Sequence, residues 1–181
     1  MRPKITNKLR GSLGEIYYKE YCDQRGWAYT SLENIHATMN REWVFTFKKG
    51  FHRIDVTIPK EIRDEISWLA KPTNNSRTSP SFVFDFLVCK VETSKDYSKV
   101  KSTKSFACAE IKTGRIMFSA GQIKAMSKMT LSLAIFHIND VLEAPENIEM
   151  KWNIKPGREW LHELEPIDNE IYEFTNMQAL R

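Results

Sequence analysis

Two acidic residues interrupt two of the most apolar stretches of the chain. Asp85 lies within residues 82–89, and Glu110 lies within residues 106–112. A carboxylate among apolar side chains is costly unless it is paired or bound to a metal ion. These two acids are therefore the first candidates for chemistry in the sequence.

Both stretches are typical of β-strands, which are short and apolar and lie between turn-forming segments. Because side chains alternate across a strand, Lys112 shares a face with Glu110. An antiparallel hairpin with its turn near residues 97–98 pairs Asp85 with Glu110, with Cβ atoms about 5 Å apart. Two ionised carboxylates at that spacing repel each other unless they share a divalent cation such as Mg²⁺, which prefers oxygen ligands. Lys112 could then orient or deprotonate a water molecule and stabilise charge on a phosphate.

The stretch 5–25 has the apolar periodicity of an amphipathic helix, and Gly26 follows it as a stop signal. Gly11 and Gly14 are unusual inside a helix, where each costs up to about 1 kcal/mol relative to Ala. Either a close approach of another backbone or a frayed first turn would explain them.

Further elements follow along the chain. Residues 43–47 and 53–58 predict a β-hairpin, and residues 61–70 predict a short helix after Pro59. Ser119 is a candidate N-cap for a helix that extends to Met129. The strong strand predicted at 131–138 would then run parallel to strand 106–112 through a helical crossover. After residue 145 we expect a strand at 150–154 and a short helix at 159–164.

The ordered set of these residues resembles the PD-(D/E)XK nuclease superfamily, which includes restriction enzymes and archaeal Holliday-junction resolvases. The motif here is Asp85 followed by Glu110-Ile111-Lys112 on the next strand. Glu15 lies on the N-terminal helix and Gln122 on the helix after the lysine, as in many members. The resemblance covers roughly residues 5–138. The sequence departs from the family pattern at Phe84, where members usually have Pro, and at Met126, where one branch has Tyr.

The resemblance implies an α/β fold with a restriction-endonuclease-like core, in which helices flank a mixed central sheet in the order αβββαβ. We expect a single domain over residues 1–181. Its core would comprise about 5–30 and 80–140, with a hairpin and helix insertion at about 31–79 and an acidic C-terminal extension at about 141–181.

The resemblance also implies a site and an activity. Asp85, Glu110 and the backbone carbonyl of Ile111 would bind Mg²⁺ or Mn²⁺, and Glu15 is a possible further ligand, with Glu20 as a nearby alternative. Lys112 would position the attacking water. Gln122 would contact a water, Lys112 or the nucleic-acid backbone, or would simply be a first-turn helix residue. The implied function is a metal-dependent deoxyribonuclease, an endonuclease that hydrolyses phosphodiester bonds, and it could act as a homodimer.

The charge distribution favours a polyanionic partner such as DNA. Residues 140–181 hold ten acids and four bases, a net charge of −6, so residues 1–139 carry +10. Candidate nucleic-acid contacts are Lys95, Lys99, Lys101, Lys104, Arg115 and Lys124. A basic solvated surface remains the plain alternative for these residues.

The remaining features exclude several classes of protein. No apolar run approaches the ~20 residues that span a bilayer, and no secretory signal is visible, so we expect a cytoplasmic protein without a membrane partner. Three cysteines without a CxxC pair argue against a disulfide framework or a zinc ribbon and favour buried free thiols. The four histidines show no ligand spacing, and His137 is expected to be a core residue.

Two other functions stay open. The chain could be a nucleic-acid-binding module that keeps the nuclease fold without catalysis. It could also be a partner-binding protein whose acidic C-terminal segment is the interaction surface, so that deleting residues 145–181 would abolish association but spare any DNA binding.

Overall fold

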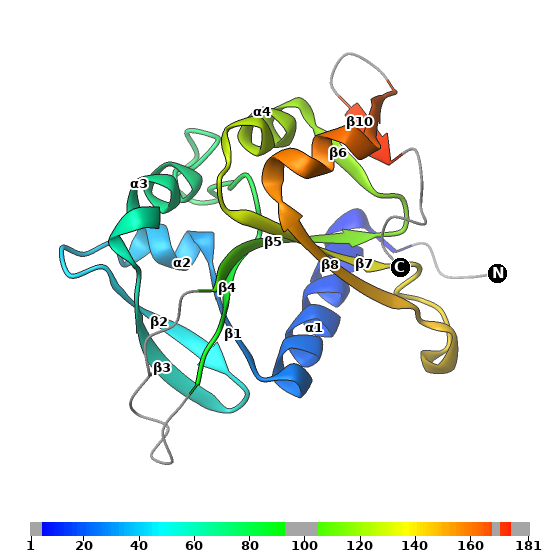
Figure 1. Cartoon of the computed structure of the whole chain (residues 1–181). Helices are drawn as coiled ribbons and strands as arrows, with labels where there is room; N and C mark the ends of the chain where they lie inside the picture. The colour runs from blue at the N-terminus through cyan, green and yellow to red at the C-terminus, as the bar shows by residue number, and fades with distance from the viewer. Residues whose placement is uncertain (1–4, 93–104, 168–170, 175–181) are drawn as a thin grey trace.

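A computed structural model describes residues 5–92, 105–167 and 171–174. Within them, seven strands form one sheet in the order β3-β2-β1-β4-β5-β7-β8 (Figure 1). The strands are β1 (Trp27–Ser31), β2 (Val44–Lys49), β3 (His52–Thr57), β4 (Phe86–Lys90), β5 (Phe106–Thr113), β7 (Ser132–Ile138) and β8 (Met150–Pro156). β5 and β7 are parallel, and the other neighbouring pairs in this part of the chain are antiparallel. The predicted mixed sheet and the predicted crossover are both confirmed.

Helices cover both faces of the sheet. α1 (Asn7–Arg25) packs on one face through Tyr18 and Cys22. α2 (Leu32–Ala37), α3 (Lys60–Leu69) and α4 (Ala120–Lys128) supply apolar residues to a second core on the other face. Figure 1 shows α1 on the opposite side of the sheet from α3 and α4. The sheet therefore has a hydrophobic core on each face, which accounts for the near-continuous apolar character of its central strands.

Gly14 is where α1 approaches the sheet most closely. A Cβ atom built on Gly14 would lie 2.7 Å from Thr113 Cγ2 and 3.3 Å from Ile111 Cγ2, whereas one on Gly11 would meet nothing within 4 Å. Close backbone approach thus explains Gly14 and leaves Gly11 without a packing role. The consequence is that the next residue, Glu15, lies beside the end of β5.

The strand predicted within residues 82–89 begins later than expected. β4 starts at Phe86, and residues 82–85 lie before it. Their backbone groups bind elsewhere. The Asp85 carbonyl accepts a hydrogen bond from the Leu32 amide at 3.2 Å, and the Val83 carbonyl accepts one from Gln122 Nε2 at 3.0 Å. Asp85 therefore lies directly before the first residue of β4 rather than within the strand.

Several elements were not predicted. α2 begins at an N-cap, where Ser31 Oγ accepts a hydrogen bond from the Asn34 amide. A small antiparallel sheet joins β6 (Met117–Ser119) to β10 (Ile171–Phe174) and β9 (Leu164–Pro166).

The C-terminal segment is part of the fold rather than an appendage. β8, which includes the predicted strand 150–154, pairs with β7 along its whole length. A short 3₁₀ turn, η1 (Pro145–Asn147), precedes β8. A longer 3₁₀ segment, η2 (Gly157–Glu163), stands near the helix expected at 159–164. It buries Trp160 completely, and the indole nitrogen donates to the Leu133 carbonyl at 2.8 Å.

The expected burial of the three cysteines is confirmed, since Cys22, Cys89 and Cys108 are buried free thiols. Each helix in the described residues is too short or too polar to cross a bilayer.

Candidate active site

The register of β4 against β5 brings the two acids together. The ladder has the predicted register and ends at the pair of Phe86 with Ala109; Asp85 directly precedes Phe86 and Glu110 directly follows Ala109, so the two acids are neighbours at this end of the paired strands. Beyond the last ladder pair, the Asp85 amide donates a hydrogen bond to the Ala109 carbonyl at 3.1 Å. Its carboxylate turns back onto β5, where Oδ2 accepts a hydrogen bond from the Ile111 amide at 2.8 Å.

Glu110 is a buried carboxylate, only 6% exposed, on the face of β5 that α4 covers. Its Oε1 lies 2.6 Å from Lys112 Nζ and accepts a hydrogen bond from Gln122 Nε2 at 2.7 Å. The positive charge of Lys112 and the amide of Gln122 offset the cost of burying this carboxylate.

Gln122 joins three segments of the site. Its Oε1 accepts a hydrogen bond from the Ser119 amide as half of a capping box at the start of α4. The same oxygen lies 3.4 Å from Lys112 Nζ, while Nε2 bonds both Glu110 and the Val83 carbonyl. Gln122 therefore caps the first turn of α4 and also contacts Lys112 and Glu110, so the two roles expected for it are compatible.

Lys112 is held in a defined position. Its side chain is 14% exposed, and Nζ lies 4.5 Å from the centre of the Phe118 ring. A cation over an aromatic face is stabilised by the ring quadrupole. The ammonium group is therefore fixed between Glu110, Gln122 and Phe118.

The pKa of Asp85 is raised well above its ordinary value. The largest cause is burial, and the Glu110 carboxylate adds to it, with a smaller contribution from Glu15. The Ile111 amide and the Lys112 ammonium act in the opposite direction. Because burial and a neighbouring carboxylate both disfavour the ionised form of Asp85, a cation bound beside it would stabilise that form.

The donor set fits a hard divalent cation that binds two protein carboxylates. In the described residues, Asp85 Oδ1 and Glu110 Oε2 take part in no hydrogen bond, although the other oxygen of each carboxylate does. Mg²⁺ commonly takes one or two carboxylates and completes its shell with water and phosphate oxygens. The described residues contain no cluster of three or more His, Cys, Asp or Glu side chains that could hold a metal, so a closed cage of protein ligands is not present there.

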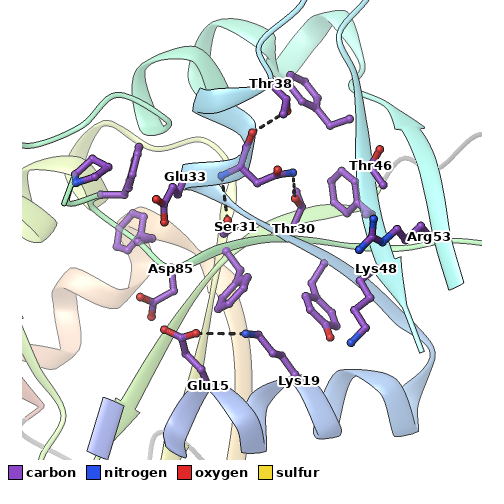
Figure 2. Close-up of a pocket in the computed structure, with 18 of the residues that line it drawn as sticks. Glu15, Lys19, Thr30, Ser31, Glu33, Thr38, Thr46, Lys48, Arg53 and Asp85 are labelled. Carbon is purple, nitrogen blue, oxygen red and sulfur yellow. Dashed lines mark hydrogen bonds and ion pairs between the residues drawn. The ribbon is translucent and has the colours of Figure 1, made fainter. Parts of the chain in front are cut away.

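The other two proposed ligands lie differently. Glu15 is exposed and pairs with Lys19 one helical turn later, at 3.4 Å. Figure 2 shows the carboxylates of Glu15 and Asp85 at the same end of a cleft. The contact between Ile111 and Asp85 runs through the Ile111 amide, and a role for the Ile111 carbonyl remains a prediction.

This cleft has a volume of about 850 Å³ and opens beside Asp85 (Figure 2). Residues of α1, β1, α2, β2 and β3 line it together with the segment before β4. Its cationic side chains are Lys19, Lys48 and Arg53, none of which was singled out from the sequence. The signal for two of them was present, because Lys48 and Arg53 flank the turn of the predicted hairpin.

The residues predicted to contact nucleic acid lie in different surroundings. Arg115 forms a two-point ion pair with Glu173 of β10, at 2.8 and 2.5 Å, so its charge is already matched. Lys124 lines a second pocket, of about 390 Å³, with Lys71, Lys128 and Trp68. Lys95, Lys99, Lys101 and Lys104 lie outside the described residues.

His137 is a core residue, as expected. It is 4% exposed, and its Nε2 lies 2.6 Å from the Gly114 carbonyl, to which it donates. Burial lowers the pKa of His137, which keeps the ring neutral and suits this structural role.

Compared with known proteins, the chain matches no family model, no curated protein and no solved structure. A function for it must therefore come from the chemistry of the site itself.

Proposed function

We propose that the protein is a metal-dependent deoxyribonuclease that hydrolyses phosphodiester bonds with Mg²⁺ or Mn²⁺. The observation that carries the proposal is the arrangement at the ends of β4 and β5. Asp85 and Glu110 are neighbours at the end of the paired strands, Lys112 forms an ion pair with Glu110, and the Gln122 amide donates to the same carboxylate. The restriction-endonuclease-like core and the homodimer belong to the same proposal.

Each residue has a definable role in such a site. Asp85 and Glu110 would hold the cation through Oδ1 and Oε2, the oxygens left free by the contacts described above. The cation would lower the pKa of a bound water and stabilise the charge that develops on the phosphate. Lys112 would orient the attacking water and place its positive charge near the phosphate oxygens. Gln122 contacts Lys112, Glu110 and the Val83 carbonyl, and so fixes the positions of the two charged side chains relative to the segment before β4.

The charges around the cleft support a polyanionic substrate. The acids Glu15, Glu33 and Asp85 and the bases Lys19, Lys48 and Arg53 line the cleft. Lys19 pairs with Glu15, whereas Lys48 and Arg53 have no acidic partner among the described residues and lie together on the β2–β3 hairpin. Cationic side chains that follow a groove attract the nucleic-acid backbone by a salt-dependent, sequence-independent interaction. A strand in this groove would bring its phosphates to Asp85, the member of the carboxylate pair that lines the cleft.

One observation favours a second function, nucleic-acid binding without hydrolysis. Lys112 neutralises Glu110, and the Ile111 amide satisfies one oxygen of Asp85, so the site has internal partners in the absence of a metal. A binding module of this kind would bind DNA with equal affinity with and without Mg²⁺, and the Lys112→Met variant would bind as wild type does.

The test is hydrolysis of plasmid, branched and single-stranded DNA in the presence of Mg²⁺ or Mn²⁺. We expect the wild type to cleave at least one of these substrates, and Asp85→Asn, Glu110→Gln and Lys112→Met to lose cleavage. Gln122→Ala, which removes a residue that orients a ligand, should lose about 10- to 100-fold.

Asp64→Asn and Glu61→Gln serve as matched controls, because both acids are exposed on α3. They should cleave as wild type does. Absence of cleavage of every substrate at several pH values, with either metal, would reject the nuclease.

A further inference from the structure

The loop that joins β2 to β3 presents an aromatic residue to solvent. Phe51 is 103% exposed, whereas the other phenylalanines of this hairpin, Phe45 and Phe47, are buried in the core. A ring that is fully exposed buries no area against the rest of the protein and so adds nothing to the hydrophobic core. Substituting Phe51 should therefore leave the stability of the fold unchanged, so that an effect on binding can be assigned to the loss of the ring itself.

The loop is held in place rather than loosely attached. Gly50 has φ of 58°, as the first position of a two-residue hairpin loop requires, and its amide donates to Asp23 Oδ1 near the end of α1 at 3.0 Å. Lys49 Nζ is bonded to the Val91 carbonyl at 3.1 Å. Phe51 is therefore presented at a fixed position relative to α1 and the sheet.

The hairpin also carries two like charges directly opposite each other. Lys48 pairs with Arg53 across the β2–β3 ladder, and both side chains line the cleft. Like charges at opposed positions of an antiparallel pair destabilise it. Among the residues that the structure describes, neither has an acidic partner, so an anion in the cleft would supply the missing counter-charge.

The cleft connects this hairpin to the carboxylate pair. Figure 2 shows Asp85 and Glu15 at one end and Lys48 and Arg53 at the other. Ser31 pairs with Phe86 and Tyr29 pairs with Lys48, so about three residues, or roughly 10 Å, separate Asp85 from Lys48 along the strands. Phe51 lies three residues beyond Lys48, which puts its ring roughly 20 Å from Asp85.

Resting on the proposed function, we propose that the substrate is DNA with a single-stranded segment, and that Phe51 stacks on an unpaired base of the bound strand. At the rise of about 3.4 Å per nucleotide that a strand has in B-form stacking, the stacked base lies roughly six nucleotides from the phosphate at Asp85. Lys48 and Arg53 contact the intervening phosphates. A base inside an intact duplex has both faces covered, so fully paired DNA does not offer Phe51 this contact.

The aromatic contact is tested by fluorescence anisotropy with labelled single-stranded DNA in chelator, where no cleavage occurs. Phe51→Ala should weaken binding of a strand of about twelve nucleotides by about tenfold, since base–aromatic stacking contributes on this scale. Phe51→Trp should retain or improve binding. Leu9→Ala, which removes an exposed apolar side chain from α1, should bind as wild type does.

Strand length and pairing provide the specific signature. A strand of about four nucleotides cannot span the cleft, so wild type and Phe51→Ala should bind it equally. The two proteins should also bind a blunt duplex equally. If Phe51→Ala instead weakened the binding of every nucleic acid, the short strand and the duplex would be affected as well.

The cationic contact is tested by the salt dependence of binding. The double variant Lys48→Gln/Arg53→Gln should lower the slope of log Kd against log salt concentration by about 1.4, since each phosphate contact on a single strand contributes about 0.7. Lys8→Gln/Lys60→Gln removes the same charge from exposed positions outside the cleft and should leave the slope unchanged.

Three results would overturn the inference. These are wild-type affinity of Phe51→Ala for the longer strand, equal weakening on the blunt duplex, or a Phe51 requirement for binding to anionic phospholipid vesicles instead of DNA. If cleavage still depends on Asp85 in any of these cases, the nuclease stands and only the Phe51 contact falls. If the wild type neither binds nor cleaves DNA, both proposals fall.

Discussion

At the scale of single residues, the site depends on two carboxylates that the fold brings together and a lysine that holds one of them. Asp85 directly precedes β4, its side chain is half-buried, and its amide donates to the Ala109 carbonyl of β5. Glu110 sits deeper and has Lys112 and Gln122 on one oxygen. The acids are thus unequal, and Asp85 is the one that faces the cleft.

The raised pKa of Asp85 predicts a pH-dependent stability for the metal-free protein. Because the folded state holds this proton more tightly than the unfolded chain, the stabilisation is complete below the ordinary carboxyl pKa. It is lost as the pH rises through the raised pKa. In chelator at about pH 8, Asp85→Asn should therefore melt at a higher Tm than wild type, and the difference should shrink toward about pH 4.

Asp64→Asn controls for the loss of one negative charge at an exposed position. The difference in Tm between this variant and wild type should not change with pH in the way expected for Asp85→Asn. A lower Tm for Asp85→Asn than for wild type at the higher pH would contradict the assignment of Asp85 as a carboxylate whose ionisation opposes folding.

At the scale of secondary-structure elements, the approach of α1 to β5 determines where Glu15 lies relative to Asp85. Gly14→Ala should lower the free energy of unfolding by about 1–3 kcal/mol, because its Cβ would overlap Thr113 Cγ2. Gly11→Ala should raise it by up to about 1 kcal/mol, since alanine favours the helix and the position is open. Urea denaturation of both variants measures the contrast.

The Gly14 effect has an internal check. Thr113→Ser removes the methyl group that the new Cβ would meet, so it should restore part of the stability lost in Gly14→Ala. An equal loss in Gly11→Ala and Gly14→Ala would show that the helix, and not its contact with β5, is responsible.

The elements that the sequence predicted well are those with local signals. The periodicity of residues 5–25 predicted α1, and the hairpin residues around Gly50 predicted β2 and β3. The register of β4 against β5, in which Phe86 pairs with Ala109, is the one predicted for a hairpin with its turn near residues 97–98.

The elements that were missed depend on distant partners. β6 and β10 pair across more than fifty residues, and the ion pair between Arg115 and Glu173 forms only once that sheet exists. The start of β4 was misplaced because the carbonyls of Val83 and Asp85 bind α4 and α2 instead of a strand. The cleft could not be predicted, since it lies among elements from separate parts of the chain.

At the scale of the whole molecule, the acidic C-terminal segment contributes to the core. β8 forms an edge of the large sheet, and Trp160 is fully buried against the α4 side. Deleting residues 145–181 would remove both, so a deletion cannot separate an interaction surface from the fold of the large sheet.

Trp160→Ala should therefore lower the free energy of unfolding by about 3–5 kcal/mol, the range for loss of a large buried aromatic side chain. It also removes the hydrogen bond from the indole to the Leu133 carbonyl. Glu159→Ala, at the exposed neighbouring position, should have little effect. Wild-type stability of Trp160→Ala would show that the segment is dispensable for folding.

The carboxylate pair is tested most directly by a crystal structure of the protein soaked with Mn²⁺, with anomalous diffraction to locate the ion. The account predicts one Mn²⁺ bound by a carboxylate oxygen of Asp85 and one of Glu110, at about the 2.0–2.2 Å typical of small divalent cations. At saturating Mn²⁺, a structure with no ion between these two side chains and the contact between Lys112 and Glu110 unchanged would contradict it.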